Sequence, residues 1–324
     1  MKRILLPLSL ALIATAGHAQ LGVLTNGGFE SWTNSVIYNT PATWTSSNQN
    51  EWYGTALCTK SNDAQHLSHS ILLENEVLSG DSLFGYAFLG MPSEADLTGF
   101  PYTSAFDAVT GFYKCNTVGN DTAFVIVSKS FGGVPYPPVF GAIYGNVSSW
   151  TAFTFPVPTG PCDSVFVGFV SSNPFDGSNF NPNTWAMFDN VSFTNTGPTP
   201  AALPNPSFET WTDVSINDPD NWDTYNTLMV STGTINVEQT TDAAAGTYAA
   251  QLSTYYIPTW GDTIPGVLTN GIIDPMAGIS TIPYAAEPAN FSGQYKYVMS
   301  GTDLAEVQVL FLQAGSTIGG FYLP

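Results

Sequence analysis

The stretch NGGFESWT at residues 26–33 decides the fold, because it returns at residues 205–212 as NPSFETWT. The Asn, the Phe-Glu pair and the Trp-Thr pair keep the same spacing in both places. A repeat with so long a period indicates two copies of a whole domain rather than a solenoid.

The matching continues beyond the opening motif. Two of the four lysines that follow residue 19 fall at one equivalent site, which chance rarely produces. The further matched residues are Pro41 with Pro219, Trp44 with Trp222, Asp63 with Asp242, Tyr102 with Tyr284, Gly111 with Gly293, and Tyr113-Lys114 with Tyr295-Lys296.

The first 19 residues have the pattern of an export signal. Two basic residues precede an apolar run that ends at Gly17-His18-Ala19, and such a segment is removed on secretion. The alternative, an uncleaved anchor, needs about 20 apolar residues to span a bilayer, and this run is shorter. We expect a secreted or cell-surface protein without a membrane span, with a signal peptide (1–19), domain 1 (20–196), a linker (197–204) and domain 2 (205–324).

Charge limits the ligands. The chain has 25 acidic residues against six Lys and Arg, and removal of the signal takes away two of these six. Nucleic-acid binding depends on cationic side chains that displace counterions, so it is excluded, and anionic sugars are disfavoured. Neutral ligands and divalent cations remain.

Short runs rich in Val, Phe and Thr predict strands. They lie between Gly, Pro and Asn turns at 123–129, 150–157, 164–171 and 186–193, and no helical periodicity competes with them. The predicted fold class is all-β, a tandem antiparallel β-sandwich. The Pro-rich stretch 195–204 predicts a semi-extended spacer.

The second copy stops at the counterpart of the strand that follows the Tyr-Lys pair. Either the sequence is a fragment or this copy is an incomplete sandwich, and the fragment is favoured because unpaired strand edges invite aggregation. The three cysteines, Cys58, Cys115 and Cys162, leave two alternatives open, one disulfide with one thiol or three buried thiols.

The order of NGGFESW, Pro-x-x-Trp, Gly-x-Tyr-Lys and a closing FDNVSF resembles exported Bacteroidetes proteins with a carbohydrate-metabolism domain. That domain is similar to jelly-roll carbohydrate-binding modules, and its bearers are usually substrates of type IX secretion. The resemblance covers most of the first copy and two-thirds of the second.

The resemblance implies a structural Ca²⁺ held by Glu30 and Asp189, with Glu209 as the counterpart in the second copy. Phe29 and Trp32 would then face the core while Glu30 turns to a pocket shared with Asp189. Calcium takes six to eight oxygen ligands. The alternative is that these acids are solvated or accept backbone hydrogen bonds.

A sugar site needs exposed aromatic faces beside polar side chains. NQNEWYG (48–54) supplies both, so Trp52 and Tyr53, with Asn50, are the first candidates, and Trp185 is the next. The alternative for Trp52 and Tyr53 is a buried loop anchor. Trp32, Trp44, Trp211 and Trp222 recur in both copies and are expected in the core. His66 and His69 could chelate a metal only on a helix, whereas their segment reads as a strand.

The sequence offers few of the side chains that catalysis needs. Glycoside hydrolysis needs only two carboxylates, but no cluster of acids alternating along one strand was apparent. The expected function is non-catalytic binding of neutral glycans, with a structural or adhesive surface protein as the alternative.

Overall fold

The computed structural model describes residues 24–50, 55–78, 80–90, 99–258, 260–274, 278–284, 288, 290–298, 300–301, 303–314 and 316–323. The predicted signal segment lies outside them. Two compact units are present, the sandwich unit (Val36–Ser215) and the second unit (Met1–Ser35 with Ile216–Pro324). Among the described residues, no helix has the length and apolarity of a membrane span.

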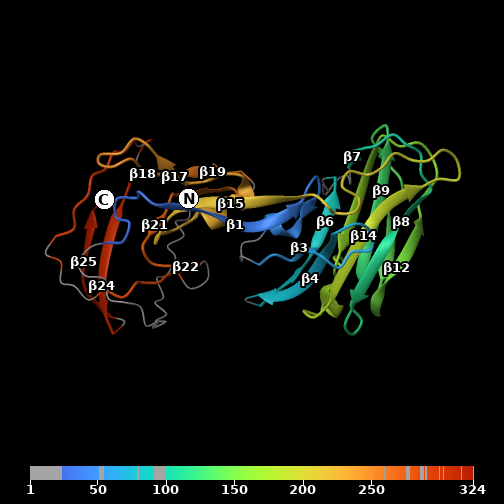
Figure 1. Ribbon diagram of the computed structural model, residues 1–324, viewed down its shortest axis with the longest axis horizontal. Helices are drawn as coiled ribbons and strands as arrows, with labels where there is room; N and C mark the ends of the chain where they lie inside the picture. The colour runs from blue at the N-terminus through green and yellow to red at the C-terminus, as the bar shows by residue number, and fades with distance from the viewer. Residues whose placement is uncertain are drawn as a thin grey trace. The chain divides into compact units, whose positions relative to one another are not determined.

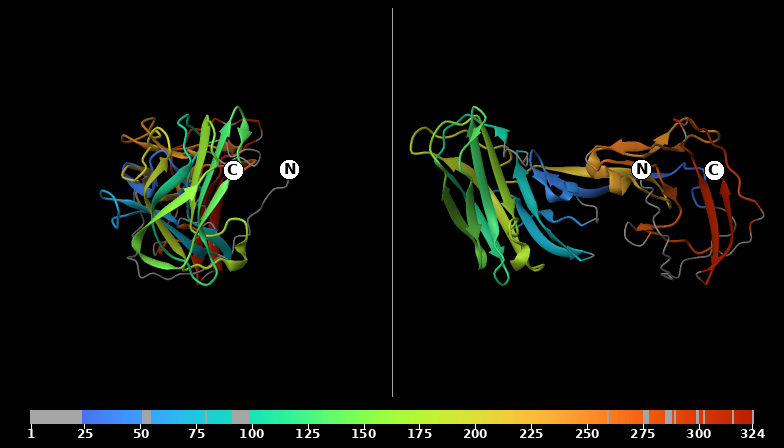
Figure 2. Two further views of the ribbon diagram at one scale, coloured as in Figure 1. Left: turned by 90° about the vertical axis from the view of Figure 1, so that its right-hand side faces the viewer. Right: turned by 180° about the vertical axis from the view of Figure 1, so that it is seen from behind.

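The sandwich unit is built from two antiparallel sheets that face each other (Figure 1, Figure 2). One sheet has the order β10 (Val134–Pro135), β9 (Ala123–Phe131), β13 (Ser164–Val170), β6 (Tyr86–Leu89) and β2 (Thr45–Ser46), with β11 (Val139–Ile143) also on β9 and β7 (Phe100–Pro101) on β13. The other has the order β12 (Asn146–Pro156), β8 (Ala108–Asn116), β14 (Trp185–Thr194), β4 (Ser70–Leu78) and β3 (Cys58–Ser61), with β5 (Asp81–Phe84) on β4.

From β6 onward the long strands alternate between the sheets, as in a jelly roll. Each of the four predicted strand runs coincides with one strand, and two of them extend one residue past its end. The all-β fold class is therefore confirmed. Side chains with a period of two fill the core: Phe188 of β14 and Phe169 of β13 are fully buried, with ring centroids 4.5 Å apart. Cys58, Cys115 and Cys162 are buried thiols of this core.

The other face of the seven-stranded sheet is also apolar. Phe166 and Val170 of β13 alternate with the core residues and are buried in a second cluster with Ile126. Tyr86 and Phe88 stack on this face with centroids 4.6 Å apart. Outward positions of a half-exposed sheet are usually polar, and the sequence pattern did not reveal this layer.

The expected spacer between the copies is packed over its last part. Leu203 is 3% exposed and belongs to the core of the sandwich unit. The Tyr102 hydroxyl donates to the Ala201 carbonyl (2.6 Å), and the Trp44 indole donates to the Pro204 carbonyl (3.1 Å). Apolar side chains within the Pro-rich stretch explain the difference, because burying Leu203 removes its surface from water.

The second unit consists of strand pairs. They are β16 (Asp223–Thr224) with β21 (Leu268–Thr269), β17 (Val237–Thr240) with β18 (Ala249–Leu252), β19 (Tyr255–Ile257) with β20 (Asp262–Ile264), β22 (Ile273–Asp274) with β23 (Gly278–Ile279), and β24 (Val307–Gln313) with β25 (Ser316–Leu323). Two short helices, α1 (Asn226–Met229) and η3 (Val230–Thr232), follow β16, and η1 (Ser47–Asn50) and η2 (Gly177–Asn179) lie in the sandwich unit.

Equivalent residues of the two units make equivalent contacts. The buried Asn48 side chain accepts from the Cys58 N–H (3.0 Å), and the buried Asn226 side chain accepts from the Val237 N–H (2.9 Å). Asp63 pairs with Lys114 and Asp242 with Lys296. The matched sequence positions therefore carry matched interactions.

Two long strands cross the boundary between the units. β1 (Trp32–Pro41) and β15 (Trp211–Pro219) pair with each other, and each begins in one unit and ends in the other. As a result, residues 26–33 belong to the second unit, whereas residues 205–212 belong to the sandwich unit.

Candidate functional site

Two carboxylates hold the loop at residues 63–69 of the sandwich unit. Asp189, which is fully buried on β14, accepts the backbone N–H groups of Gln65 (2.7 Å) and His66 (2.8 Å). Glu209 accepts those of Ser68 (3.1 Å) and His69 (2.9 Å). A carboxylate that accepts backbone N–H groups makes a strong, charge-assisted hydrogen bond.

Glu30 makes the same contact in the second unit. Its carboxylate accepts the N–H groups of Thr247 (3.0 Å) and Tyr248 (3.3 Å), which are the counterparts of Ser68 and His69. The Glu30 carboxylate thus contacts a loop of its own unit, and the pocket that Glu30 is expected to share with Asp189 stays a prediction. Glu209 meets the loop that Asp189 holds, because the two NxxFExW segments sit in each other's units.

The contacts of these acids do not fit a calcium ion. The groups that face Asp189 and Glu209 are N–H donors, whereas calcium requires oxygen ligands. Burial raises the pKa of Asp189, the neighbouring Glu209 charge adds to the rise, and the N–H donors oppose it. Within the described ranges, no group of three or more His, Cys, Asp or Glu side chains converges.

The two histidines of the same loop have different surroundings. The His66 Nδ1 lies 3.1 Å from the Ser207 hydroxyl. His69 Nδ1 is buried and makes no hydrogen bond with the described part of the chain.

The first sugar-site candidates fall outside the part of the chain that the structure describes. Trp52 and Tyr53 lie outside the described residues, and so does the side chain of Asn50. Near their flanking residues is a cleft of about 260 Å³, lined by Ile37, Tyr38, Asn39, Asn48, Ala56, Cys58, Thr59 and Lys60. Asn48 is held there by bonds to the Asn39 and Cys58 carbonyls (2.9 and 2.6 Å).

Trp185, the next candidate, opens β14 on the outer face of the six-stranded sheet. It stands opposite Glu74 of β4 and Asn116 of β8. Residues directly opposite in an antiparallel pair project from the same face. One step along, Met187 stands between Leu72 and Lys114. We call Leu72, Glu74, Lys114, Trp150 and Trp185 the outer platform.

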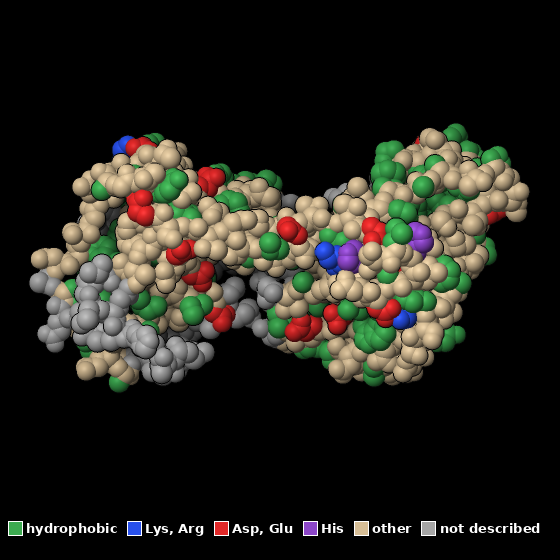
Figure 3. Space-filling model, viewed as in Figure 1, with side chains coloured by type: hydrophobic (Ala, Val, Ile, Leu, Met, Phe, Trp, Pro, Cys, Tyr) green, Lys and Arg blue, Asp and Glu red, His purple; other side chains and the backbone are tan. Residues whose placement is uncertain are grey.

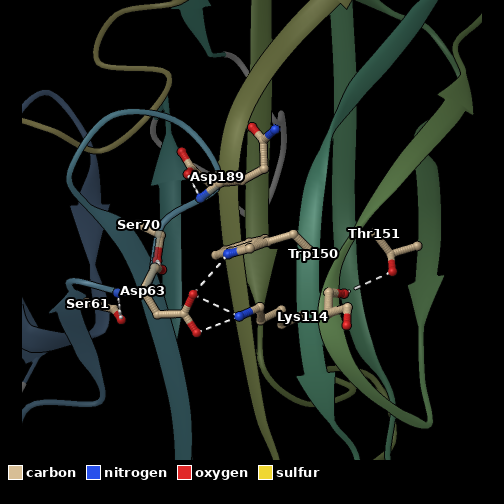
Figure 4. Close-up of polar contacts among 9 residues, drawn as sticks. Ser61, Asp63, Ser70, Lys114, Trp150, Thr151 and Asp189 are labelled. Atoms are coloured by element: carbon tan, nitrogen blue, oxygen red, sulfur yellow. Dashed lines mark hydrogen bonds and ion pairs between the residues drawn. The ribbon is translucent and has the colours of Figure 1, made fainter.

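Asp63 orients the second tryptophan of the outer platform (Figure 4). The Trp150 indole donates to Asp63 (3.0 Å), and the Lys114 ammonium donates to the same carboxylate (2.8 Å) while lying 5.2 Å from the Trp150 ring centroid. The bond from Lys114 holds the pKa of Asp63 below its usual value, with a smaller contribution from Trp150. Both tryptophans remain partly exposed.

The loop at 171–184 is anchored by Asp121, which is 2% exposed. Its carboxylate accepts from the Ser172 hydroxyl (2.6 Å), the Asn181 N–H (3.1 Å) and the Asn75 amide (3.0 Å). Beyond these anchors Phe175 is 69% exposed and packs edge-on against Phe140, with centroids 5.1 Å apart. Sequence inspection missed Asp121, because its donors come from distant segments.

The recurring tryptophans differ in depth. Trp44 is 2% exposed, which confirms its place in the core. Trp211 is half-buried against that core. Trp32 and Trp222, in the second unit, are half-buried as well.

β4 carries an alternating acid pair that the expectation of non-catalysis overlooked. Glu74 and Glu76 flank the inward Asn75, so both project from the outer face. Burial raises the pKa of Glu74, and the nearby Glu76 charge adds to the rise. Two acids therefore alternate along this strand, although no cluster of alternating acids was expected.

No family model matches this sequence, and no curated protein matches it either. Solved structures show remote likenesses. A candidate glycoside hydrolase from Bacteroides thetaiotaomicron is 13% identical (TM-score 0.37), and the match covers 48% of this chain and 63% of that one. A candidate glycoside hydrolase from Bacteroides vulgatus is 13% identical (TM-score 0.36, 52% of this chain and 96% of that one). TmCBM61, in complex with β-1,4-galactotriose, is 11% identical (TM-score 0.27, 54% and 99%).

Proposed function

We propose that this chain binds neutral glycans on the outer platform of the six-stranded sheet. The observation that carries the proposal is the placement of Trp150 and Trp185 on one sheet face, with polar side chains around them. β8 separates their strands, so the strands lie about 10 Å apart. Aromatic faces beside a few fixed polar groups are what sugar rings require.

The Asp63–Lys114 pair supports the proposal by fixing a ring before any ligand arrives. Trp150 is held by one hydrogen bond and one cation–π contact. A preorganised side chain loses less conformational entropy when it binds. The acidic pair Asp63 and Glu74 would accept hydrogen bonds from sugar hydroxyls.

Neutral ligands are favoured by the charge of the chain. The formal net charge is −19, and the view in Figure 3 shows scattered acidic side chains with very few basic ones. Lys114, the cation of the outer platform, is already paired with Asp63. An anionic sugar would meet repulsion there.

A test is affinity electrophoresis of the full chain in gels that contain a panel of neutral polysaccharides. Trp185→Ala should weaken binding about tenfold or more, since stacking on an aromatic face is worth about 1–3 kcal/mol by analogy with nucleobases. Phe140→Ala, an exposed ring on the other sheet, is the matched control and should leave binding unchanged. Equal loss in both variants, or unchanged binding in Trp185→Ala, would contradict the proposal.

A second candidate, glycoside hydrolysis, is favoured by Glu74 and Glu76. Same-face neighbours two residues apart on a strand have Cα atoms about 6.8 Å apart, and retaining glycosidases hold their carboxyl groups about 5–5.5 Å apart. Incubation of the full chain with the bound polysaccharide decides the matter. Release of reducing ends that Glu74→Gln and Glu76→Gln both abolish would identify an enzyme.

The adhesive alternative is favoured by the exposed Phe140–Phe175 pair, because apolar patches on soluble proteins often mark contact surfaces. Failure of every polysaccharide in the panel to retard the chain would favour this alternative.

A further inference from the structure

The two NxxFExW segments have exchanged places. We call residues 26–33 segment 1 and residues 205–212 segment 2. Segment 1 follows the start of the first copy in sequence but packs in the second unit, and segment 2 opens the second copy but packs in the sandwich unit. Each segment lies in a socket formed by the other copy's residues.

The sockets recognise the segments through the same contacts. Socket A is the surface around Ala42 and Trp44 that segment 2 fills. There the Ala42 N–H donates to the Thr210 carbonyl (2.9 Å), and Phe208 packs on Trp44 with ring centroids 5.1 Å apart. Socket B is the equivalent surface around Asp220 and Trp222 that segment 1 fills. There the Asp220 N–H donates to the Ser31 carbonyl (2.9 Å), and Phe29 packs on Trp222 with ring centroids also 5.1 Å apart.

The conformation of the segments is also shared. The Asn205 side chain donates to the Ala42 carbonyl (3.2 Å), as the Asn26 side chain donates to the Asp220 carbonyl (3.0 Å). The Asn and the Phe of both segments have positive φ, at 50° and 56° in segment 1 and 43° and 53° in segment 2. Such angles are costly for a bulky residue, so each socket selects one defined shape.

The segments differ in how deeply they are held. Phe208 is fully buried, and Leu203 just before it is a core residue. Phe29 is only half-buried, and Glu30 is exposed where Glu209 is half-buried. Segment 1 is therefore the one that leaves its socket more readily.

We propose that two copies of this chain associate by exchanging segment 1, so that residues 26–33 of each chain fill socket B of the other. The contacts in the exchanged dimer are the ones already described, with each partner contributing Phe29 and Glu30 to the other's socket. Exchange of an identical element needs no new complementarity and closes with two-fold symmetry.

The experiment uses full-length chains with single cysteine substitutions. The Ser31 hydroxyl donates to the Asp220 carboxylate, so the two side chains are in contact. Ser31→Cys chains are mixed with Asp220→Cys chains at high concentration under native conditions, left to exchange and then oxidised. We expect a disulfide-linked dimer that contains one chain of each kind.

The matched control is the equivalent pair in socket A, Thr210→Cys mixed with Ala42→Cys, which should stay unlinked between chains because segment 2 is held more deeply. A chain with both Ser31→Cys and Asp220→Cys should form the bond and shows that the geometry permits it.

Two results would overturn the proposal. In the first, the chain with both Ser31→Cys and Asp220→Cys forms its disulfide, but the mixture of single variants gives no disulfide-linked dimer. The other is a double variant that fails to link, because segment 1 would then not occupy socket B at all. A Phe29→Ala substitution in the Ser31→Cys chain should reduce the linked dimer severalfold, and unchanged linking would show that dimer formation does not depend on the socket.

Discussion

Segments 1 and 2 form the same hydrogen bonds, yet they lie at different depths. Phe208 packs on Trp44 and also on Phe169 of β13, with centroids 6.1 Å apart in the latter pair. Phe29 packs on Trp222. The comparison shows that the motif specifies the contacts, whereas the strands behind the socket determine how much they stabilise.

The largest expected effect is at the deeper phenyl ring. Phe208→Ala should lower the free energy of unfolding of the sandwich unit by about 3–5 kcal/mol, as for other buried Phe deletions. Phe29→Ala should lower the free energy of unfolding of the second unit by clearly less, because that ring is only half-buried. Urea unfolding followed by tryptophan fluorescence measures both. Equal losses would mean that the sockets do not differ in depth.

Leu203 tests the anchoring of segment 2. Leu203→Ala should lower the free energy of unfolding by about 2–3 kcal/mol in the same urea experiment, which is within the range for buried Leu. Pro200→Ala, in the same stretch, is the control and should change little. A loss under 0.5 kcal/mol for Leu203→Ala would show that the stretch is a spacer after all.

The glutamates should show the same contrast on a smaller scale. Glu209→Gln should cost about 1–2 kcal/mol, because a charge-assisted bond becomes a neutral one beside a partly buried loop. Glu30→Gln, at the exposed equivalent position, should change the unfolding midpoint little. The reverse order would contradict the assignment of the deeper socket.

The Asp63–Lys114 pair should give a small effect that depends on pH. The pKa of Asp63 is lowered in the folded chain, so its contribution is present above its ordinary pKa and lost as pH falls through the lowered value. Asp63→Asn should lower the free energy of unfolding by at most about 1 kcal/mol at pH 7, as for exposed pairs. In acid, the variant and the unsubstituted chain should have the same free energy of unfolding. A difference that grows in acid would refute the ion pair.

The smallest expected effect is the change in melting temperature when EDTA removes free calcium. If Asp189 and Glu209 hold backbone N–H groups rather than calcium, EDTA should leave the melting temperature unchanged. A ligand that binds the folded state raises this temperature by mass action. A drop with EDTA that added calcium restores, and that Glu209→Gln abolishes, would return calcium to this site.

Part of this structure could be predicted from the sequence. Strand composition gave the all-β class, and the matched Asp63 and Asp242 are indeed paired with the matched lysines. The exchange could not be predicted, because segments 1 and 2 carry the same recognition residues and the sequence does not say which socket each one fills. The resemblance gave Asp189 the acid of its own copy, Glu30, as partner, and this pairing stays a prediction. Within the sandwich unit, Glu209 holds the same loop as Asp189.

The candidate site was only partly predictable. Trp185 could be chosen as an unmatched aromatic, but its neighbours on the outer platform follow from strand register, which residue spacing alone does not give. Glu74 and Glu76 are two residues apart in the sequence, and their shared outer face follows from the inward side chain of Asn75, which donates to Asp121.

Asp121 separates the loop at 171–184 into a fixed base and a variable tip. Its bonds to Ser172 and Asn181 close the base, so the residues between them can change without loosening β13 or β14. For protein engineering, this makes the turn around Asp176 and Gly177 an insertion point. A library of displayed peptides could be carried there, on a base that is held by Asp121 and by the Asn75–Asn181 and Val118–Thr184 hydrogen bonds.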